Sequence, residues 1–290
     1  MLTEVQANQV PSWRNDSGLV SKTVIVTGAG CEIGRATAIA FAEARSYVLA
    51  VDLNGEAVSE TVEMLPETGR SEFACDLADL STHAEIFHLA TLKAPLVAVA
   101  HLAAVLVRRD TVDEVSEEDW DLQHSVNLKV AFFLNRCARE VFVKQGTGGA
   151  IINFSSQGWW TGGFGGSGAY AASKGGVVSM SRGLARSFAP DGVRVNVVAP
   201  GGVDTAMMLG GQDPAALQSF ISMIPSGRLA EPEEMTGAVL FLASNSSSYI
   251  TGALLKNFRW PTVVLKRYLV SALNLKFVSV LNQTPLRGPN

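Results

Sequence analysis

A tyrosine and a lysine four residues apart form the pair in this sequence best suited to acid–base chemistry. Tyr170 and Lys174 lie in the segment Ala-Tyr-Ala-Ala-Ser-Lys, and Ser156 lies fourteen residues before the tyrosine. Residues four apart on a helix point to the same side, so the phenol and the ammonium group would address one site. A cation beside the phenol is expected to lower its pKa from about 10 and favour the phenolate. We therefore predict that Tyr170 exchanges a proton with a substrate oxygen, which the Ser156 hydroxyl would hold as charge develops there.

The second motif is a glycine-rich turn near the start of the chain, Thr-Gly-Ala-Gly-Cys-Glu-Ile-Gly at residues 27–34. It follows the β-branched run 24–26 and leads into residues 33–44, whose apolar positions repeat at helical spacing. A strand, a glycine turn and a helix in this order place backbone N–H groups where a pyrophosphate can bind. A glycine turn alone would equally fit a tight connection without a ligand. Beside the Ser, Tyr and Lys, it predicts hydride transfer involving an alcohol or a ketone.

Taken together, these motifs resemble the short-chain dehydrogenase/reductase family, whose glycine motif is TGxxxGxG and whose active site combines Asn, Ser, Tyr and Lys. The resemblance runs from about residue 22 to residue 255. It implies Asn127, Ser156, Tyr170 and Lys174 as the catalytic set, with Asn127 helping to carry a water-linked proton relay to the lysine. It also implies a cofactor site made of Gly28, Cys31, Glu32, Ile33, Gly34, Asp52, Asp76, Leu77, Ala103, Tyr170, Lys174, Pro200, Gly201, Val203 and Thr205.

Three positions depart from the family pattern. Glu32 stands where the motif has its middle glycine, and its carboxylate adds a possible negative charge beside the phosphate position. Residues 101–104 are His-Leu-Ala-Ala instead of Asn-Asn-Ala-Gly, so the contacts of the structural asparagine are expected to be lost. After Leu255 the usual Val-Asp-Gly-Gly is replaced by a different kind of sequence.

The choice of cofactor is predicted from charge. Asp52 ends the apolar run 47–52, about twenty residues past the glycine turn, where a carboxylate can accept hydrogen bonds from both ribose hydroxyls. The same carboxylate would repel a 2′-phosphate. Relatives that prefer NADP usually carry a basic residue at the position of Cys31 or beside the acidic residue, where this chain has Leu53. NAD is therefore favoured over NADP.

Large apolar side chains surround the predicted chemistry. Trp159, Trp160 and Phe164 lie between Ser156 and Tyr170, and Met207 follows in the segment that covers the substrate in the family. These residues are candidates for an apolar pocket that takes a small alcohol or ketone. The tryptophan pair would equally suit a subunit interface or the core, and no residue selects one substrate.

Alternating strand and helix signals predict an α/β fold, a single Rossmann-type doubly wound domain with a mostly parallel sheet of about seven strands. Strands are expected at 23–27, 47–52, 71–75, 96–101, 149–155, 193–198 and 252–256, and a long helix at 116–144. We expect residues 22–255 to form this domain, after a flexible extension at 1–21. Residues 256–290 hold six basic and no acidic residues among apolar ones and form an atypical tail.

Composition narrows the possible partners. The net charge is −4, and no basic stripe interleaved with aromatics runs through the motif-bearing region, which argues against nucleic acid. The longest apolar run, 94–107, has fourteen residues and is too short to span a bilayer. Three dispersed cysteines favour a reduced, cytoplasmic setting, and the four histidines lack metal-ligand spacing. The family resemblance implies a homodimer or homotetramer.

Two functions from other classes are alternatives. A catalytically weak nucleotide-binding sensor or scaffold would suit Glu32 and the lost asparagine, but its expected signature is a broken catalytic set, and all four residues are present. A serine hydrolase is suggested by Gly-Gly-Ser-Gly-Ala at 165–169. That segment fails the G-x-S-x-G pattern at its fifth position, and no predicted strand precedes Ser167.

Overall fold

Seven parallel strands form one sheet in the order β3-β2-β1-β4-β5-β6-β7. The computed structural model describes residues 17–211 and 213–257. The strands are β1 Thr23–Thr27, β2 Tyr47–Asp52, β3 Arg70–Ala74, β4 Leu96–His101, β5 Gly149–Phe154, β6 Val193–Pro200 and β7 Leu254–Asn257. The predicted α/β fold with a doubly wound parallel sheet is confirmed, and the boundaries of every predicted strand lie within about two residues of those observed.

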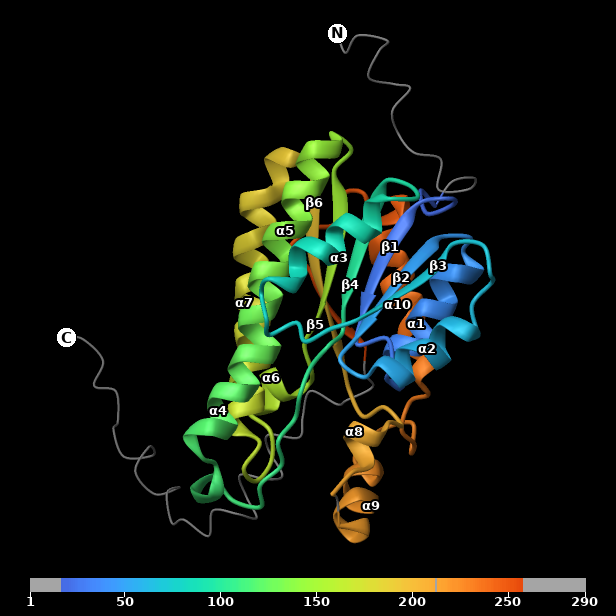
Figure 1. Cartoon of the computed structure of the whole chain (residues 1–290). Coiled ribbons are helices and arrows are strands. Elements are labelled where there is room, and N and C mark those ends of the chain that lie inside the picture. The colour runs from blue at the N-terminus through green and yellow to red at the C-terminus, as the bar shows by residue number, and fades with distance from the viewer. Residues whose placement is uncertain (1–16, 212, 258–290) are drawn as a thin grey trace, which may run out of the picture.

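Helices cover both faces of the sheet (Figure 1). Those with α labels are α1 Glu32–Glu43, α2 Gly55–Glu63, α3 Thr82–Thr91, α4 Glu117–His124, α5 Val130–Gln145, α6 Gly158–Thr161, α7 Gly168–Phe188, α8 Ala206–Leu209, α9 Pro214–Ser222 and α10 Thr236–Ala243. Short 3₁₀ turns lie at Val112–Glu114, Ala189–Asp191, Pro232–Met235 and Asn245–Ser247. Helices α1, α2 and α10 pack on one face, and α3, α5 and α7 pack on the other.

Each face of the sheet has its own apolar core. On one face Phe41 of α1 and Leu242 of α10 pack against strand residues, and on the other Leu134 of α5 and Phe188 of α7 do the same. Because the inner strands are covered on both sides, they are largely continuous apolar runs, whereas the edge strand β3 has no buried residue. Full burial of one such side chain stabilises the fold by about 1.5–3 kcal/mol.

The strand order reverses direction between β1 and β4. From β1 the sheet continues through β2 and β3, and from β4 it continues the other way through β5, β6 and β7. Helix α1, which follows β1, packs on one face, whereas α5, which precedes β5, packs on the other. In doubly wound sheets this divergence opens a crevice at the carboxyl ends of the strands. In Figure 1 these ends point down towards α4, α6 and α8.

The helical segment predicted at 116–144 is interrupted. It begins at Ser116, whose hydroxyl accepts the Asp119 N–H while the Asp119 carboxylate accepts the Ser116 N–H. A π-helical turn at Ser125–Lys129 then separates α4 from α5. Such a turn adds one residue to the helical repeat, and apolar periodicity alone does not reveal where this occurs.

Residues at both ends of the predicted domain pack closely. Leu19 is buried in the core beside α1, and the Ser17 carbonyl accepts a 2.9 Å hydrogen bond from the Asn245 N–H. The packed chain therefore begins before the predicted boundary at Lys22, and β7 extends two residues into the predicted tail. The rest of the predicted extension and tail, 1–16 and 258–290, lies outside the described residues. None of the helices within 17–211 and 213–257 has the length and apolar character needed to cross a membrane.

Candidate active site

The structure brings together the three side chains first singled out for chemistry. Ser156 follows β5, and Tyr170 and Lys174 lie on α7 facing the same side. The Ser156 and Tyr170 side chains are hydrogen-bonded. The Lys174 Nζ atom lies 5.7 Å from the centre of the Tyr170 ring and donates a 3.0 Å hydrogen bond to the Phe154 carbonyl. The predicted geometry of this group is therefore confirmed by the arrangement of β5 and α7.

The predicted lowering of the Tyr170 pKa is wrong in direction. Burial raises the pKa of Tyr170 to about 12, although the hydrogen bond with Ser156 and the charge of Arg108 act in the opposite sense. Burial also lowers the pKa of Lys174 to about 8. Desolvation of a phenolate outweighs the nearby charges at this position. The phenol therefore keeps its proton at neutral pH and is ready to donate it.

Asn127 lies on the π-helical turn and is buried. Its side-chain amide bonds both backbone groups of Val105, with Nδ2 donating to the carbonyl at 2.9 Å and Oδ1 accepting from the N–H at 2.8 Å. Nδ2 also donates to Ser173 Oγ, which in turn donates to the Tyr170 carbonyl. These contacts give a reason for an asparagine inside a helical segment, since they join the loop after β4 to α7.

The glycine turn packs against the loop that follows β4. Gly28 has a φ of +71°, and a Cβ atom there would lie 2.8 Å from the Ala103 nitrogen. A Cβ atom at Gly34 would collide with the Gly28 carbonyl. Thr27 Oγ1 accepts hydrogen bonds from the N–H groups of Leu102 and Ala103 at 3.2 and 3.3 Å. The positions therefore require glycine, and they set the N-terminus of α1 at the crevice, which fits the binding of a dinucleotide.

His101 stands at the position of the family's structural asparagine and makes a polar contact of its own. The side chain is 3% exposed, and its Nδ1 atom is hydrogen-bonded to Thr27 Oγ1 at 2.8 Å. Burial lowers the pKa of this imidazole to about 3, so the ring is neutral. The expected loss of a polar contact at this position is thus offset by a buried link between β4 and β1.

Asp52 and Glu32 flank the glycine turn. The Asp52 carboxylate accepts the Gly30 N–H at 2.9 Å and the Asn54 N–H at 3.0 Å at the end of β2. The Glu32 carboxylate begins α1 and accepts a 2.7 Å hydrogen bond from the N–H of Ala206, the first residue of α8. The side chain that replaces the motif's middle glycine therefore reaches across to the segment after β6.

The other residues of the predicted cofactor site lie along the same edge of the sheet. They are Cys31, the N-cap of α1, Ile33 in its first turn, Asp76 and Leu77 after β3, Pro200, which ends β6, and Gly201, Val203 and Thr205 after it. Thr205 caps α8, because its hydroxyl accepts the Met208 N–H at 3.2 Å.

The apolar residues predicted to line the substrate pocket are mostly exposed. Trp160 is 51%, Phe164 52% and Met207 41% exposed, which excludes core packing for these three side chains. Trp159 contacts Trp160 edge to face with the ring centres 5.3 Å apart. The Lys256 Nζ atom lies 4.3 Å from the centre of the Trp160 ring, so the start of the predicted tail also contacts this aromatic pair.

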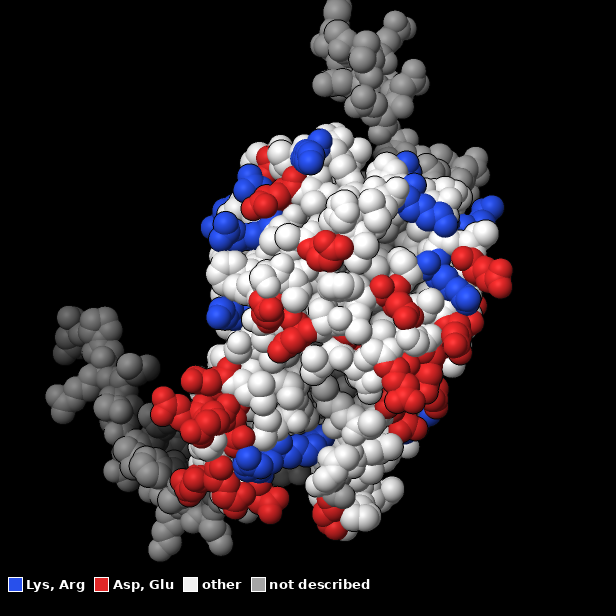
Figure 2. Space-filling model, in the orientation of Figure 1, with Lys and Arg blue, Asp and Glu red and all other residues white. Residues whose placement is uncertain are grey.

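Sequence reasoning missed Arg108, whose charge acts on Tyr170. Its Nη2 atom donates to the carbonyls of Met207 at 2.7 Å and Met208 at 3.2 Å, and so connects the loop after β4 to α8. A short basic band between α4 and α8 is visible in Figure 2. Two adjacent arginines, Arg108 and Arg109, just after a buried strand were the available signal.

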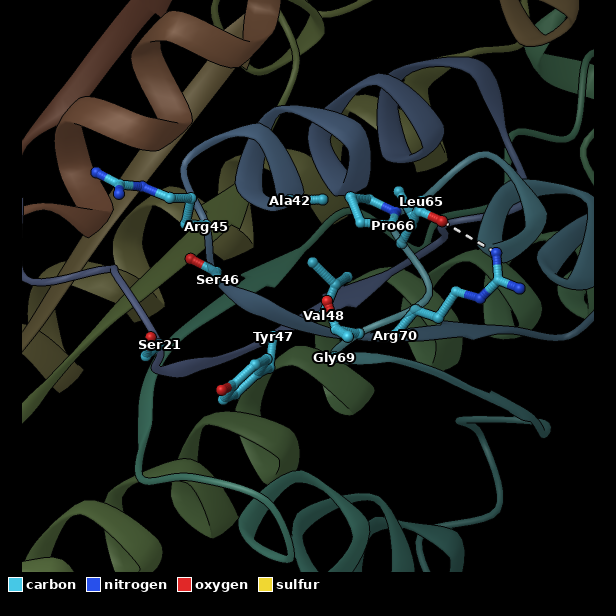
Figure 3. A pocket seen from close by; sticks show the side chains of 11 residues that line it. Ser21, Ala42, Arg45, Ser46, Tyr47, Val48, Leu65, Pro66, Gly69 and Arg70 are labelled. Atoms are coloured by element: carbon cyan, nitrogen blue, oxygen red, sulfur yellow. Dashed lines mark hydrogen bonds between the residues drawn. The ribbon is translucent and has the colours of Figure 1, made fainter.

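A separate cavity of about 280 Å³ lies at the amino ends of the strands (Figure 3). Arg70 lines it, but its Nη1 atom donates to the carbonyls of Val62 and Leu65, both at 2.9 Å. This guanidinium therefore caps the end of α2, and the cavity lies on the edge of the sheet opposite the candidate site.

Comparisons with known proteins agree with this arrangement. Residues 28–256 match the family model described as enoyl-(acyl carrier protein) reductase. The chain is 36% identical over 247 residues to (3R)-3-hydroxyacyl-CoA dehydrogenase of Canis lupus familiaris, covering 81% of this chain and 94% of the relative. It is 32% identical to 2-dehydro-3-deoxy-D-gluconate 5-dehydrogenase of Dickeya dadantii, covering 82% and 94%.

Solved structures include a similar protein of Beutenbergia cavernae, proposed to be an NAD(P)-dependent gluconate 5-dehydrogenase, with NADP bound at low occupancy. Its TM-score is 0.77 at 34% identity, covering 83% of this chain and 96% of that chain. The chain therefore belongs to the short-chain dehydrogenase/reductase family. It is an oxidoreductase that acts on hydroxyl or keto groups with a nicotinamide cofactor.

Proposed function

We propose that this protein interconverts a secondary alcohol and a ketone, with Tyr170 as the general acid and base and NAD(H) as the favoured cofactor. The observation that carries the proposal is the Tyr170 phenol, which is hydrogen-bonded to Ser156 and lies beside the fixed Lys174 ammonium group. The assembly of this set, with Asn127 joined to α7, opposes the alternative of a scaffold that has lost its chemistry.

The residues divide the work between binding and proton transfer. The glycine turn, Asp52 and Thr205 would hold the dinucleotide, which supplies the hydride acceptor or donor when bound. Ser156 donates a hydrogen bond to the substrate oxygen and holds it beside the phenol. Tyr170 gives its proton to that oxygen in reduction and takes it back in oxidation.

Charge supports the preference for NAD. Asp52 places a carboxylate at the end of β2, and its oxygens already accept two backbone N–H groups, which fixes its position. A fixed negative charge there favours ribose hydroxyls and repels a 2′-phosphate. Cys31 and Leu53 offer no compensating positive charge.

Replacement of Tyr170 by Phe tests the proposal. The variant should lose nearly all turnover, about 10²–10⁴-fold, because only the exchangeable proton is removed. Its affinity for NAD should stay close to that of the wild type. The measurement is nicotinamide absorbance against a panel of alcohols and ketones with NAD and with NADP, beside a binding titration of each cofactor. Near-normal turnover by the variant would contradict the role of Tyr170, and better wild-type turnover with NADP would contradict the cofactor assignment.

A further inference from the structure

Arg108 stands where three segments meet beside the candidate active site. Its guanidinium contacts α8 through the carbonyls of Met207 and Met208. The next residue, Arg109, accepts a hydrogen bond through its carbonyl from the Gly166 N–H, at 3.0 Å, in the loop between α6 and α7. The loop after β4, α8 and the α6–α7 loop therefore converge at Arg108 and Arg109. Two of the apolar side chains predicted to face the substrate lie in these segments, Met207 on α8 and Phe164 in the α6–α7 loop.

The guanidinium of Arg108 has unused hydrogen-bond donors. Both of its contacts use Nη2, and among the described residues Nε and Nη1 have no acceptor. It also forms no ion pair there, whereas Arg109 beside it is held by the Asp119 carboxylate at 2.8 and 2.9 Å. A partly buried cation without a counter-charge is costly unless a ligand supplies one.

The charge of Arg108 lies near the phenol that would transfer the proton. Arg108 and the Tyr170 phenol are close enough for each to influence the pKa of the other. An anionic group bound by Arg108 would therefore sit near a hydroxyl or keto group held at Tyr170. Charge-assisted hydrogen bonds from a guanidinium to a carboxylate are among the strongest in proteins.

We propose that Arg108 binds a carboxylate of the substrate, so that the alcohol or ketone turned over at Tyr170 belongs to a hydroxy acid or keto acid. This inference rests on the proposed function and extends it from a type of reaction to a class of substrate. Arg108 is then a specificity residue, and its contacts with α8 keep the guanidinium in place.

The test compares hydroxy acids of three to six carbons with the primary amides of the same acids, which keep the carbon skeleton and lose the charge. Wild type, Arg108→Met and Arg108→Lys are assayed for kcat and KM on each pair. Arg45→Met serves as the control, because Arg45 is exposed at the amino ends of the strands and its substitution removes the same charge far from the site.

We expect the wild type and Arg45→Met to prefer the acids. Arg108→Met should lose about 10- to 100-fold in kcat/KM on the acids, mainly through KM, and change little on the amides. Arg108→Lys should recover part of the loss, since it restores the charge without the planar geometry. An equal loss on acids and amides would overturn the proposal and leave Arg108 only an anchor of α8.

A wild type that turns over both members of each pair equally, with turnover abolished in Tyr170→Phe, would overturn this inference while the proposed function stands. Turnover that persists in Tyr170→Phe would instead overturn the proposed function itself.

Discussion

Lys174 places a buried ammonium group behind Tyr170, and this arrangement costs the fold free energy. Burial lowers the pKa of Lys174 from its ordinary 10.5 to about 8, so below pH 8 the folded state holds a charge that the unfolded chain hydrates better. A lowering of this size corresponds to about 3 kcal/mol against folding at pH 7. The penalty declines as pH rises from about 8 towards 10.5, where the unfolded chain also loses the proton.

Lys174→Met should therefore stabilise the protein while abolishing its chemistry. We expect a gain of about 2 kcal/mol at pH 7, because the lost bond to the Phe154 carbonyl offsets about 1 kcal/mol of the relief. The gain should shrink towards pH 10. Urea unfolding at pH 7, 8.5 and 10 measures it, with the exposed Lys144→Met as control. A difference in stability that does not change with pH would contradict the argument.

At the residue scale, the sequence predicted which side chains lie together better than it predicted their pKa values. The spacing of Ser156, Tyr170 and Lys174 was enough to bring these side chains into one group, because a strand end and one helix face are local features. The direction of the Tyr170 pKa was not predictable, since it depends on how much of the phenol is desolvated by the whole fold. Arg108 was missed because its partners on α8 lie about a hundred residues away.

At the element scale, one contact joins the first turn of α1 to α8. The Glu32 carboxylate accepts the Ala206 N–H, and it lies at the helix N-terminus that would receive the pyrophosphate. A carboxylate there satisfies the positive end of the helix, but it also repels an incoming diphosphate. Glu32 is therefore expected to weaken the binding of the dinucleotide.

Glu32→Gln removes the negative charge but keeps the contact, because the amide oxygen can still accept the hydrogen bond from the Ala206 N–H. We expect it to bind NAD about fivefold more tightly, with a smaller gain for adenosine, which lacks the diphosphate. Calorimetric titration of both ligands at two salt concentrations measures the difference. Glu43→Gln, at the exposed far end of α1, is the matched control. Weaker binding of NAD by Glu32→Gln would show instead that the carboxylate organises the site.

The sequence predicted the elements closely where their signals are local. Strands stood out as apolar runs between turns, and Ser116 marked the start of α4 through its own side chain. The π-helical turn at Asn127 was not foreseen, because apolar periodicity does not reveal the extra residue and the bonds from Asn127 to Val105 join positions 22 residues apart. The four-residue α8 also gives little periodic signal, and its capping residue Thr205 was noted only for its place in a motif.

At the scale of the whole molecule, one groove brings several apolar side chains to the surface beside polar ones. A groove of about 980 Å³ runs between the α4–α5 segment and α7, and its lining includes Leu128, Phe132, Phe133, Gly176 and Met180. Phe132 is 37% exposed, and Trp120 on α4 is 47% exposed. Apolar side chains gathered in an exposed groove are typical of an interface. Because association is usual in the family that the sequence resembles, we propose that a second copy of the chain covers this groove.

Phe132→Glu tests the oligomer directly. In a two-fold interface one substitution introduces two charges, one from each copy, so a large effect is expected from a single change. We expect the wild type to be a dimer or tetramer and the variant to dissociate at concentrations at least about tenfold higher than the wild type does. Light scattering over a dilution series measures this, and Leu92→Glu, which alters an exposed leucine at the end of α3, is the control. A monomeric wild type, or equal association of both variants, would show that this face is not the interface.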